Sequence, residues 1–253
     1  SRGLGDVYKR QPSLQGKTIV NLFFENSTRT RISFELAQKR LSADTVNFSA
    51  SSSSLKKGES FKDTVQNIEA MKIDAVVMRH PSPGSSVHLT KYIKSIVINA
   101  GDGAHEHPTQ AILDMMSLKE KFGKIRGLKI GIIGDIAHSR VARSNIYGLI
   151  KMGAEVMVCG PPTLIPIEII SLGAKISYNL DEVLDWADAI NVIRIQLERM
   201  NRGLFPSVRE YRKLFGITDE RLQKHNKEII IMHPGPMNRG VEIDTKLADD
   251  INV

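Results

Sequence analysis

The feature of this sequence that most constrains its fold is an alternation of short apolar runs with segments whose apolar residues recur at helical spacing. The runs predict strands at residues 18–24, 45–48, 75–78 and 96–99, and a second series at 128–133, 154–159, 189–193 and 228–232. Helices are expected from residue 30, after Ser60, and at residues 108–122, 141–151 and 181–186. Strands that are apolar throughout are buried on both faces, which is typical of parallel sheets covered by helices. The predicted fold class is therefore α/β, with two doubly wound domains of parallel sheet joined by an interdomain helix at residues 108–122.

The expected domain boundary follows that helix, with one domain at residues 12–122 and the other at residues 123–253. Residues 1–11, SRGLGDVYKRQ, have no periodicity and are expected to be a non-native leader. In doubly wound sheets, ligands bind beyond the carboxyl ends of the strands. Functional residues are therefore expected just after the predicted strands.

Charge and composition restrict the class of ligand. The 253 residues include 35 Lys and Arg against 28 Asp and Glu, a formal net charge of +7, with 6% aromatic residues. Such an excess is compatible with a solvated basic surface, nucleic acid, acidic lipid or small anions. There is no run of five cations, and several arginines follow predicted strands, which favours a pocket for small anions over a groove for a polymer.

Two further observations concern location. No apolar run is long enough for a membrane helix, which needs roughly 18 residues. The single cysteine, Cys159, excludes an internal disulfide and a multi-cysteine zinc site. Both favour a cytoplasmic protein without a membrane partner, and the distribution of charge described above argues against a nucleic-acid partner.

The sharpest local motif is residues 24–31, FENSTRTR, which follows a predicted strand and opens a predicted helix. Backbone N–H groups at the start of a helix are unpaired and carry partial positive charge, so they attract phosphate. Ser27, Thr28 and Thr30 add hydroxyl donors, and Arg29 adds a charged donor that can bind bidentately. An ordinary helix cap beside solvated arginines is the alternative, but this density of donors directly after a strand favours an anion site.

A second motif is residues 107–110, HPTQ, at the start of the next long helix. A histidine just before a helix tends to stay neutral, because the positive helix end disfavours imidazolium. His107 can then donate a hydrogen bond to a carbonyl oxygen, and Gln110 can accept one from an amide nitrogen. With the first motif, this segment resembles the aspartate and ornithine carbamoyltransferases, whose carbamoyl phosphate loop has the same Ser-Thr-Arg-Thr pattern. The resemblance spans nearly all of residues 12–253.

The resemblance implies roles for individual residues. It implies that the catalytic groups around the carbonyl oxygen are Thr30, Arg79 and His107. It implies a carbamoyl phosphate site formed by Ser27, Thr28, Arg29, Thr30, Ser53, Lys57, Arg79, His107 and Gln110. His80, which follows Arg79, is expected to be structural.

The segment at residues 53–59, SSLKKGE, is typical of a mobile surface loop. In aspartate carbamoyltransferases the corresponding loop reaches into the site of a neighbouring subunit. The resemblance therefore implies that Ser53 and Lys57 act across a subunit boundary. It also implies a homotrimer with shared sites, and a regulatory subunit is possible.

The second half of the chain indicates the acceptor. An amino-diacid needs two separate cationic groups, one for each carboxylate, and planar guanidinium suits both. The resemblance assigns an aspartate site to Lys57, Arg140, Arg194, Gln196, Pro234 and Gly235, the last two through backbone carbonyls. Arg143 and Arg199 are expected to be structural. Ornithine enzymes typically carry Ser-Met-Gly and His-Cys-Leu-Pro segments in this domain, and neither occurs here.

The reaction that the resemblance implies gives N-carbamoyl-L-aspartate and phosphate, a step of pyrimidine biosynthesis. It needs no cofactor and no metal; a metal pair at His105 and His107 is the weaker interpretation of that segment. The alternatives are a carbamoyltransferase with another amine acceptor and an inactive paralogue that binds metabolites. Family members finish with a long helix, which is expected to be missing from this sequence.

Overall fold

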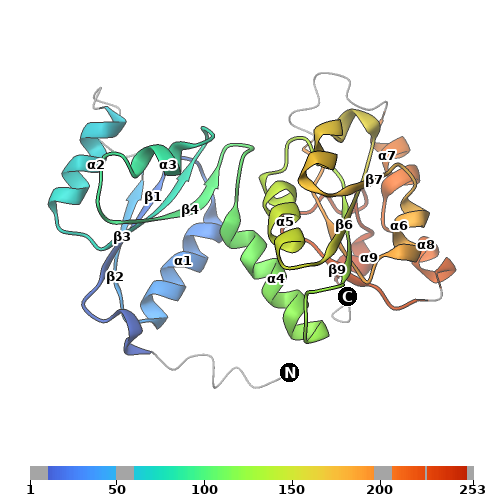
Figure 1. Cartoon of the computed structure of the whole chain (residues 1–253), viewed down its shortest axis with the longest axis horizontal. Helices are drawn as coiled ribbons and strands as arrows, with labels where there is room; N and C mark the ends of the chain where they lie inside the picture. The colour runs from blue at the N-terminus through green and yellow to red at the C-terminus, as the bar shows by residue number, and fades with distance from the viewer. Residues whose placement is uncertain (1–10, 50–59, 197–206, 226, 250–253) are drawn as a thin grey trace. The chain divides into compact units, whose positions relative to one another are not determined.

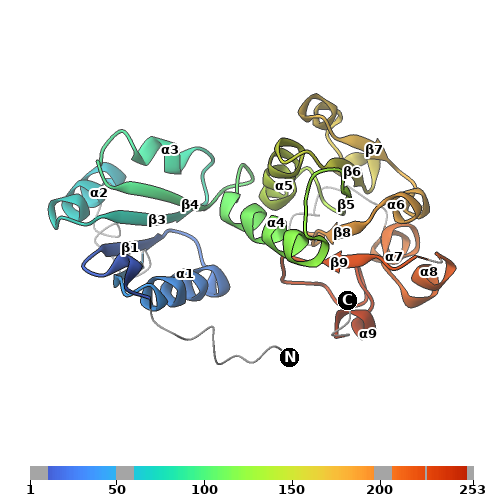
Figure 2. The same cartoon turned by 60° about the horizontal axis from the view of Figure 1, so that its bottom comes forward.

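The computed structural model describes residues 11–49, 60–196, 207–225 and 227–249. Its contacts divide the chain into two units, Ser1–His107 and Pro108–Val253. Each unit contains one fully parallel sheet covered by helices on both faces (Figures 1 and 2), which confirms the predicted fold class. Helix α4 (Pro108–Phe122) is grouped with the second unit. The boundary expected after residue 122 stays a prediction.

The first unit has a four-stranded sheet in the order β2-β1-β3-β4. Its strands are β1 (Thr18–Phe23), β2 (Asp44–Ser49), β3 (Ala75–His80) and β4 (Ile96–Asp102), and its helices are η1 (Pro12–Leu14), α1 (Thr28–Arg40), α2 (Phe61–Ala70) and α3 (Ser85–Leu89). Alternate residues of β1 face opposite sides: Val20 and Leu22 join a core with α2 and α3, whereas Ile19 and Phe23 join a core with Phe34 of α1. This double burial explains why β1 is apolar almost throughout.

The second unit has a five-stranded sheet in the order β7-β6-β5-β8-β9. Its strands are β5 (Lys129–Ile133), β6 (Glu155–Cys159), β7 (Lys175–Ser177), β8 (Ala189–Val192) and β9 (Ile230–Met232). Its helices, besides α4, are α5 (Arg140–Lys151), η4 (Pro162–Leu164), η5 (Ile167–Leu172), α6 (Leu180–Trp186), α7 (Val208–Phe215), α8 (Asp219–Lys224) and α9 (Thr245–Ala248). Helices α4 and α5 pack on one core of this sheet, and α6, α7 and α9 pack on the other. The strand order reverses between β5 and β8, which is where doubly wound sheets bind ligands.

Among the α-helices and strands of the described residues, five short elements have no counterpart in the sequence predictions: α3, β7, α7, α8 and α9. Strand β7 has only three residues and lies at the edge of its sheet. Segments of this length contain too few residues to establish a period of 2 or 3.6. They are held in place by packing against longer elements, which local patterns do not encode.

One glycine permits a close approach between strand ends in the second unit. Gly134, directly after β5, has a φ of +132°, and a Cβ there would lie 2.3 Å from the carbonyl oxygen of Ile193. Only glycine tolerates this contact. The loop from β5 to α5 can therefore run beside the segment that follows β8. None of the helices in the described residues combines the length and hydropathy needed to cross a bilayer.

Candidate active site

The end of strand β3 brings together the three residues predicted to be catalytic. The guanidinium of Arg79 donates from Nη1 to the hydroxyl of Thr30 at 3.2 Å, and the same nitrogen lies 3.4 Å from Nε2 of His107. Nη1 also donates to the carbonyl oxygen of Ala100 at 3.1 Å. The Arg79 side chain is only 12% exposed. Thr30 and His107, which are 49 and 28 positions from Arg79 in the sequence, thus both contact its largely buried guanidinium.

The start of α1 carries the other hydroxyl and cationic groups of the first motif. Ser27 is the N-cap residue, but its side chain does not accept a hydrogen bond from the first turn. By contrast, Ser60 and Ser139 each cap their helices in this way. Thr28 and Arg29 are exposed, and the first turn contains no acidic residue. This helix start therefore has the hydroxyl, cationic and backbone donors that an anion site requires.

Glu25 is a member of the site that the sequence interpretation missed. One of its carboxylate oxygens lies 2.6 Å from Nε of Arg79, and both side chains are largely buried. The ion pair with Glu25 therefore restricts the orientation of the Arg79 guanidinium on its Nε side. A carboxylate inside a segment otherwise rich in cations and hydroxyls was the available signal. Its partner could not be read from the sequence, because Arg79 lies on another strand.

Asp102, at the end of β4, organises the loop that leads to His107. Its carboxylate is 1% exposed and accepts hydrogen bonds from the N–H groups of Gly84 at 2.7 Å and Glu106 at 2.9 Å. Burial acts to raise the pKa of Asp102, but the hydrogen bonds from Asn99, Gly84, His105 and Glu106 outweigh it and hold that pKa below its usual value. His105 contacts this carboxylate at 3.2 Å. Among the described residues, no group of three or more His, Cys, Asp and Glu is arranged to hold a metal ion.

The second unit gathers the predicted acceptor residues at the carboxyl ends of β5, β8 and β9. Arg140 is the first residue of α5, and Ser139 caps that helix by accepting from the N–H of Ala142 at 3.1 Å. Gln196 donates from Nε2 to the carbonyl oxygen of His138 at 3.1 Å. This bond joins the segment after β8, which carries Arg194, to the loop before Arg140.

The segment after β9 is tied to the same place. Asn238 donates to the carbonyl oxygen of Ile195 at 2.8 Å, and Glu242, which is fully buried, accepts from the N–H of Asn238. His233 accepts from the N–H of Gly235 at 2.8 Å and so holds the turn that contains Pro234. The predicted backbone contributors therefore lie in a segment linked directly to the Arg194 segment.

Gln110 lies in the first turn of α4 and contacts a buried carboxylate one turn along. Its Nε2 donates to Oδ1 of Asp114 at 2.8 Å. Asp114 is 7% exposed and also accepts from Asn145 of α5 and Asn191 of β8. Burial raises the pKa of Asp114, and the three amide hydrogen bonds oppose that shift. The sequence interpretation did not include Asp114.

Other predictions fall outside this picture. Ser53, Lys57 and Arg199 lie outside the described residues. His80 packs against the edges of the rings of Phe24 and Phe61, at 5.0 and 5.8 Å between centroids, and these two rings also contact each other. That environment agrees with the structural role expected for His80.

Comparison with protein families matches both halves of the chain. The model described as the carbamoyl-P binding domain of aspartate/ornithine carbamoyltransferases matches residues 3–120. The model described as the Asp/Orn binding domain of the same enzymes matches residues 126–252. Two relatives named aspartate carbamoyltransferase catalytic subunit, from Christiangramia forsetii and Flavobacterium psychrophilum, are 61% and 60% identical over 241 residues. Each alignment covers 95% of this chain and 78% of the relative.

Solved structures show the same similarity. Aspartate transcarbamoylase from Trypanosoma cruzi in complex with carbamoyl phosphate is 30% identical, with a TM-score of 0.86 over 98% of this chain and 80% of that one. The same enzyme in complex with carbamoyl aspartate and phosphate gives a TM-score of 0.84 with the same identity and coverage. Both domain models and these relatives therefore lead to one conclusion: the chain belongs to the aspartate/ornithine carbamoyltransferase family.

Proposed function

We propose that this chain transfers the carbamoyl group of carbamoyl phosphate to the α-amine of L-aspartate, giving N-carbamoyl-L-aspartate and phosphate. Family membership and the names of relatives at about 60% identity support the reaction. The structural observation that carries it is the convergence of Thr30 and His107 on the guanidinium of Arg79. The product enters pyrimidine biosynthesis.

In the proposed mechanism, the deprotonated amine attacks the carbonyl carbon of carbamoyl phosphate, and a C–N bond forms. The carbonyl oxygen takes the electron pair and becomes a tetrahedral oxyanion. The intermediate then collapses: the oxyanion pair re-forms the C=O bond, and the C–O bond to phosphate breaks. Phosphate leaves with the electron pair of the broken bond and accepts the proton of the amine. No covalent bond to the protein is formed.

The residues around Arg79 suit the charge that develops on the carbonyl oxygen. Donors fixed in advance around such an oxygen stabilise the transition state more than the ground state. Nη1 of Arg79 lies within 3.4 Å of both Thr30 Oγ1 and His107 Nε2, so their donors can reach a common oxygen atom. The contact between Nε of Arg79 and Glu25 holds the plane of the guanidinium. Ser27, Thr28 and Arg29 are proposed to bind the phosphate group. Gln110 is proposed to bind the carbamoyl nitrogen.

Arg140, Arg194 and Gln196 are proposed to bind the two carboxylates of aspartate. Hydrogen bonds between the β5, β8 and β9 segments support this assignment, because they bring two separate cationic groups to one end of one sheet. The amine would be oriented by the carbonyl groups near Pro234 and Gly235. Holding two small anions in attack geometry supplies much of the rate.

The assembly and location belong to the proposal as well. We propose a cytoplasmic homotrimer in which Ser53 and Lys57 complete the site of a neighbouring subunit. A regulatory subunit is compatible with this assembly, since the names of the relatives describe catalytic subunits.

An assay of N-carbamoyl-L-aspartate formation tests the function directly. Arg79→Ala should lower turnover by about 10²- to 10³-fold, the usual effect of removing a donor to a developing oxyanion. Arg143→Ala is the matched control, because Arg143 stacks on the ring of Tyr147 at 5.7 Å and has no assigned role in the reaction. Near-parental turnover of folded Arg79→Ala would refute its assignment. A parent chain that carbamoylates ornithine in preference to aspartate would refute the acceptor.

A further inference from the structure

The buried carboxylate of Asp114 is the centre of a hydrogen-bond network made of side-chain amides. Oδ1 accepts from Nε2 of Gln110 at 2.8 Å. Oδ2 accepts from Nδ2 of Asn145 at 2.6 Å and from Nδ2 of Asn191 at 2.9 Å. The three donors come from α4, α5 and β8, up to 77 positions away in sequence.

The network fixes which way each amide points. An ionised carboxylate only accepts hydrogen bonds, so each amide must turn its nitrogen toward Asp114 and its oxygen away. In this orientation, Asn145 and Asn191 each leave an acceptor unsatisfied, because their Oδ1 atoms are buried without a hydrogen-bond partner. Buried acceptors without partners destabilise a fold. Stability alone therefore does not account for this arrangement.

We propose that Asp114 is a positioning residue that holds the Gln110 amide with its oxygen presented to the carbamoyl nitrogen of carbamoyl phosphate. This inference rests on the proposed function. A carbamoyl NH₂ group donates hydrogen bonds, so it needs an acceptor. A free glutamine side chain could present either its oxygen or its NH₂ group. Because Asp114 binds the NH₂ group of Gln110, only the oxygen can face the substrate. The site therefore favours a substrate with an NH₂ group at this position over one with a methyl group.

The same contacts link Gln110 to the elements that carry the acceptor residues. Asn145 lies on α5, which begins at Arg140, and Asn191 lies on β8, two residues before Ile193 and three before Arg194. Asp114 is therefore a junction between the residue that would recognise the carbamoyl group and the two segments that would bind aspartate.

The variant Asp114→Asn replaces the carboxylate by an amide of the same shape. Two arrangements are then possible, since the new amide can turn either its oxygen or its nitrogen toward Asn145 and Asn191. Turning its nitrogen that way would require both buried neighbours to rotate and would leave their NH₂ groups buried without acceptors, which is rare in proteins. The favoured arrangement rotates only Gln110, which is partly exposed and then presents its NH₂ group to the substrate.

The test compares carbamoyl phosphate with acetyl phosphate, which has a methyl group in place of the carbamoyl NH₂ group. In Asp114→Asn, the KM for carbamoyl phosphate should rise about tenfold. The inhibition constant of acetyl phosphate should change by less than about twofold, because a methyl group neither donates nor accepts a hydrogen bond. Asn145→Ala is the control for a weakened network, since it keeps the bond between Asp114 and Gln110. It should lower stability without changing the ratio of the two constants.

Two double variants separate positioning from general damage. In a Gln110→Met background, Asp114→Asn should have no further effect on the KM for carbamoyl phosphate. Exchange of the two groups in Asp114→Asn/Asn191→Asp keeps one buried carboxylate. The carboxylate moved to position 191 can only accept, so it draws the NH₂ group of the amide at position 114 and turns the oxygen of that amide back toward Gln110. Only Asn145 must then rotate, and its oxygen, which has no partner in the parent chain, accepts from the same NH₂ group. The exchange should restore the preference for carbamoyl phosphate, and it provides a folded variant if Asp114→Asn alone does not fold.

Equal weakening of both ligands in Asp114→Asn, additive effects in the Gln110→Met background, or no recovery in the exchange variant would each overturn the inference. These outcomes leave the proposed function standing, because the parent chain still forms N-carbamoyl-L-aspartate. A parent chain that forms none contradicts the proposed function itself, and the inference with it.

Discussion

Arg79 and His80 are neighbours on β3, yet their surroundings give them different chemistry. Arg79 contacts Glu25, Thr30 and His107 through polar atoms. His80 instead lies among aromatic rings, and its Nδ1 accepts from the N–H of Ser82 at 2.9 Å. Burial lowers the pKa of His80 below its ordinary value, and the nearby carboxylates of Glu25 and Asp102 only partly offset this. The alternation of a strand places one side chain in a site and the next in a core.

The lowered pKa of His80 predicts a stability change in mild acid. In the unfolded chain the imidazole binds a proton at a pH of about 6.5, whereas in the folded chain it does so only at lower pH. Between those values the unfolded state binds more protons, so the free energy of unfolding should fall as the pH drops below about 6.5. His80→Asn keeps an acceptor for Ser82 and removes this titration. Urea unfolding at several pH values should show a shallower loss for the variant than for the parent; parallel curves would contradict the prediction.

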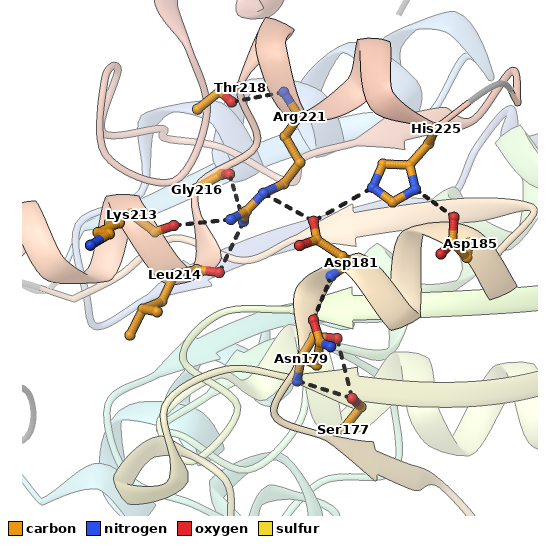
Figure 3. Close-up of polar contacts among 10 residues, drawn as sticks. All are labelled: Ser177, Asn179, Asp181, Asp185, Lys213, Leu214, Gly216, Thr218, Arg221 and His225. Carbon is orange, nitrogen blue, oxygen red and sulfur yellow. Dashed lines mark hydrogen bonds and ion pairs between the residues drawn. The ribbon is translucent and has the colours of Figure 1, made fainter.

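At the scale of elements, one arginine of α8 contacts both α6 and the end of α7 in the second unit (Figure 3). The guanidinium of Arg221, on α8, lies 3.2 Å from a carboxylate oxygen of Asp181, at the start of α6. It also donates to three carbonyl groups around the end of α7, those of Lys213, Leu214 and Gly216. His225, directly after α8, lies between the carboxylates of Asp181 and Asp185 and so adds a second contact between α8 and α6. Carbonyls at the end of a helix lack partners within the helix, so these bonds satisfy groups that would otherwise need water.

This contact predicts a local effect on stability. Arg221→Ala should lower the free energy of unfolding by roughly 2 kcal/mol, because three carbonyl groups and a carboxylate lose a charged donor. Arg221→Lys should not restore the loss, since a single ammonium cannot reach the same set of acceptors. Arg209→Ala on the exposed face of α7 is the control and should change the value by less than about 0.5 kcal/mol. Equal urea midpoints for the Arg221 and Arg209 variants would rule out the assigned role.

At the scale of the whole molecule, each unit presents its candidate residues at the carboxyl ends of a parallel sheet. In the first unit these are the ends of β1, β3 and β4, and in the second the ends of β5, β8 and β9. The chain is thus built from two similar layered units with different polar residues on equivalent edges. The proposed trimer would add a third contribution, from Ser53 and Lys57 of a neighbouring subunit.

Mixing two inactive variants tests whether sites are shared. Lys57→Ala and Arg79→Ala chains, denatured together and refolded as mixed trimers, should regain activity. If a site takes Arg79 from one subunit and Lys57 from its neighbour, random assortment at equal amounts leaves about a quarter of the sites intact. Each variant refolded alone is the control. Mixed trimers verified by size and by two different tags, but without recovered activity, would show that each site lies within one chain.

The long elements and the positions of the motifs could be predicted from the sequence, because both are local. The repeated apolar runs indicated two parallel sheets. The segment FENSTRTR indicated an anion site after a strand, and HPTQ indicated a helix start that contacts a carbonyl oxygen and an amide nitrogen. The short elements α3, β7, α7, α8 and α9 could not be predicted, since too few residues define their period. What determined the local structure was hydrophobic spacing and turn chemistry within a few residues.

Only the tertiary structure decided which side chains meet. The pairing of Glu25 with Arg79 and the network around Asp114 join residues that lie on different strands and helices, up to 77 positions apart. Such contacts depend on strand order and register, and hydrophobic periodicity is the same for many orders of the same strands. The sequence determined that this chain has two α/β units with candidate anion-binding segments after their strands. The order β2-β1-β3-β4 placed β3 beside both β1 and β4, and so brought Arg79 to Thr30 and His107.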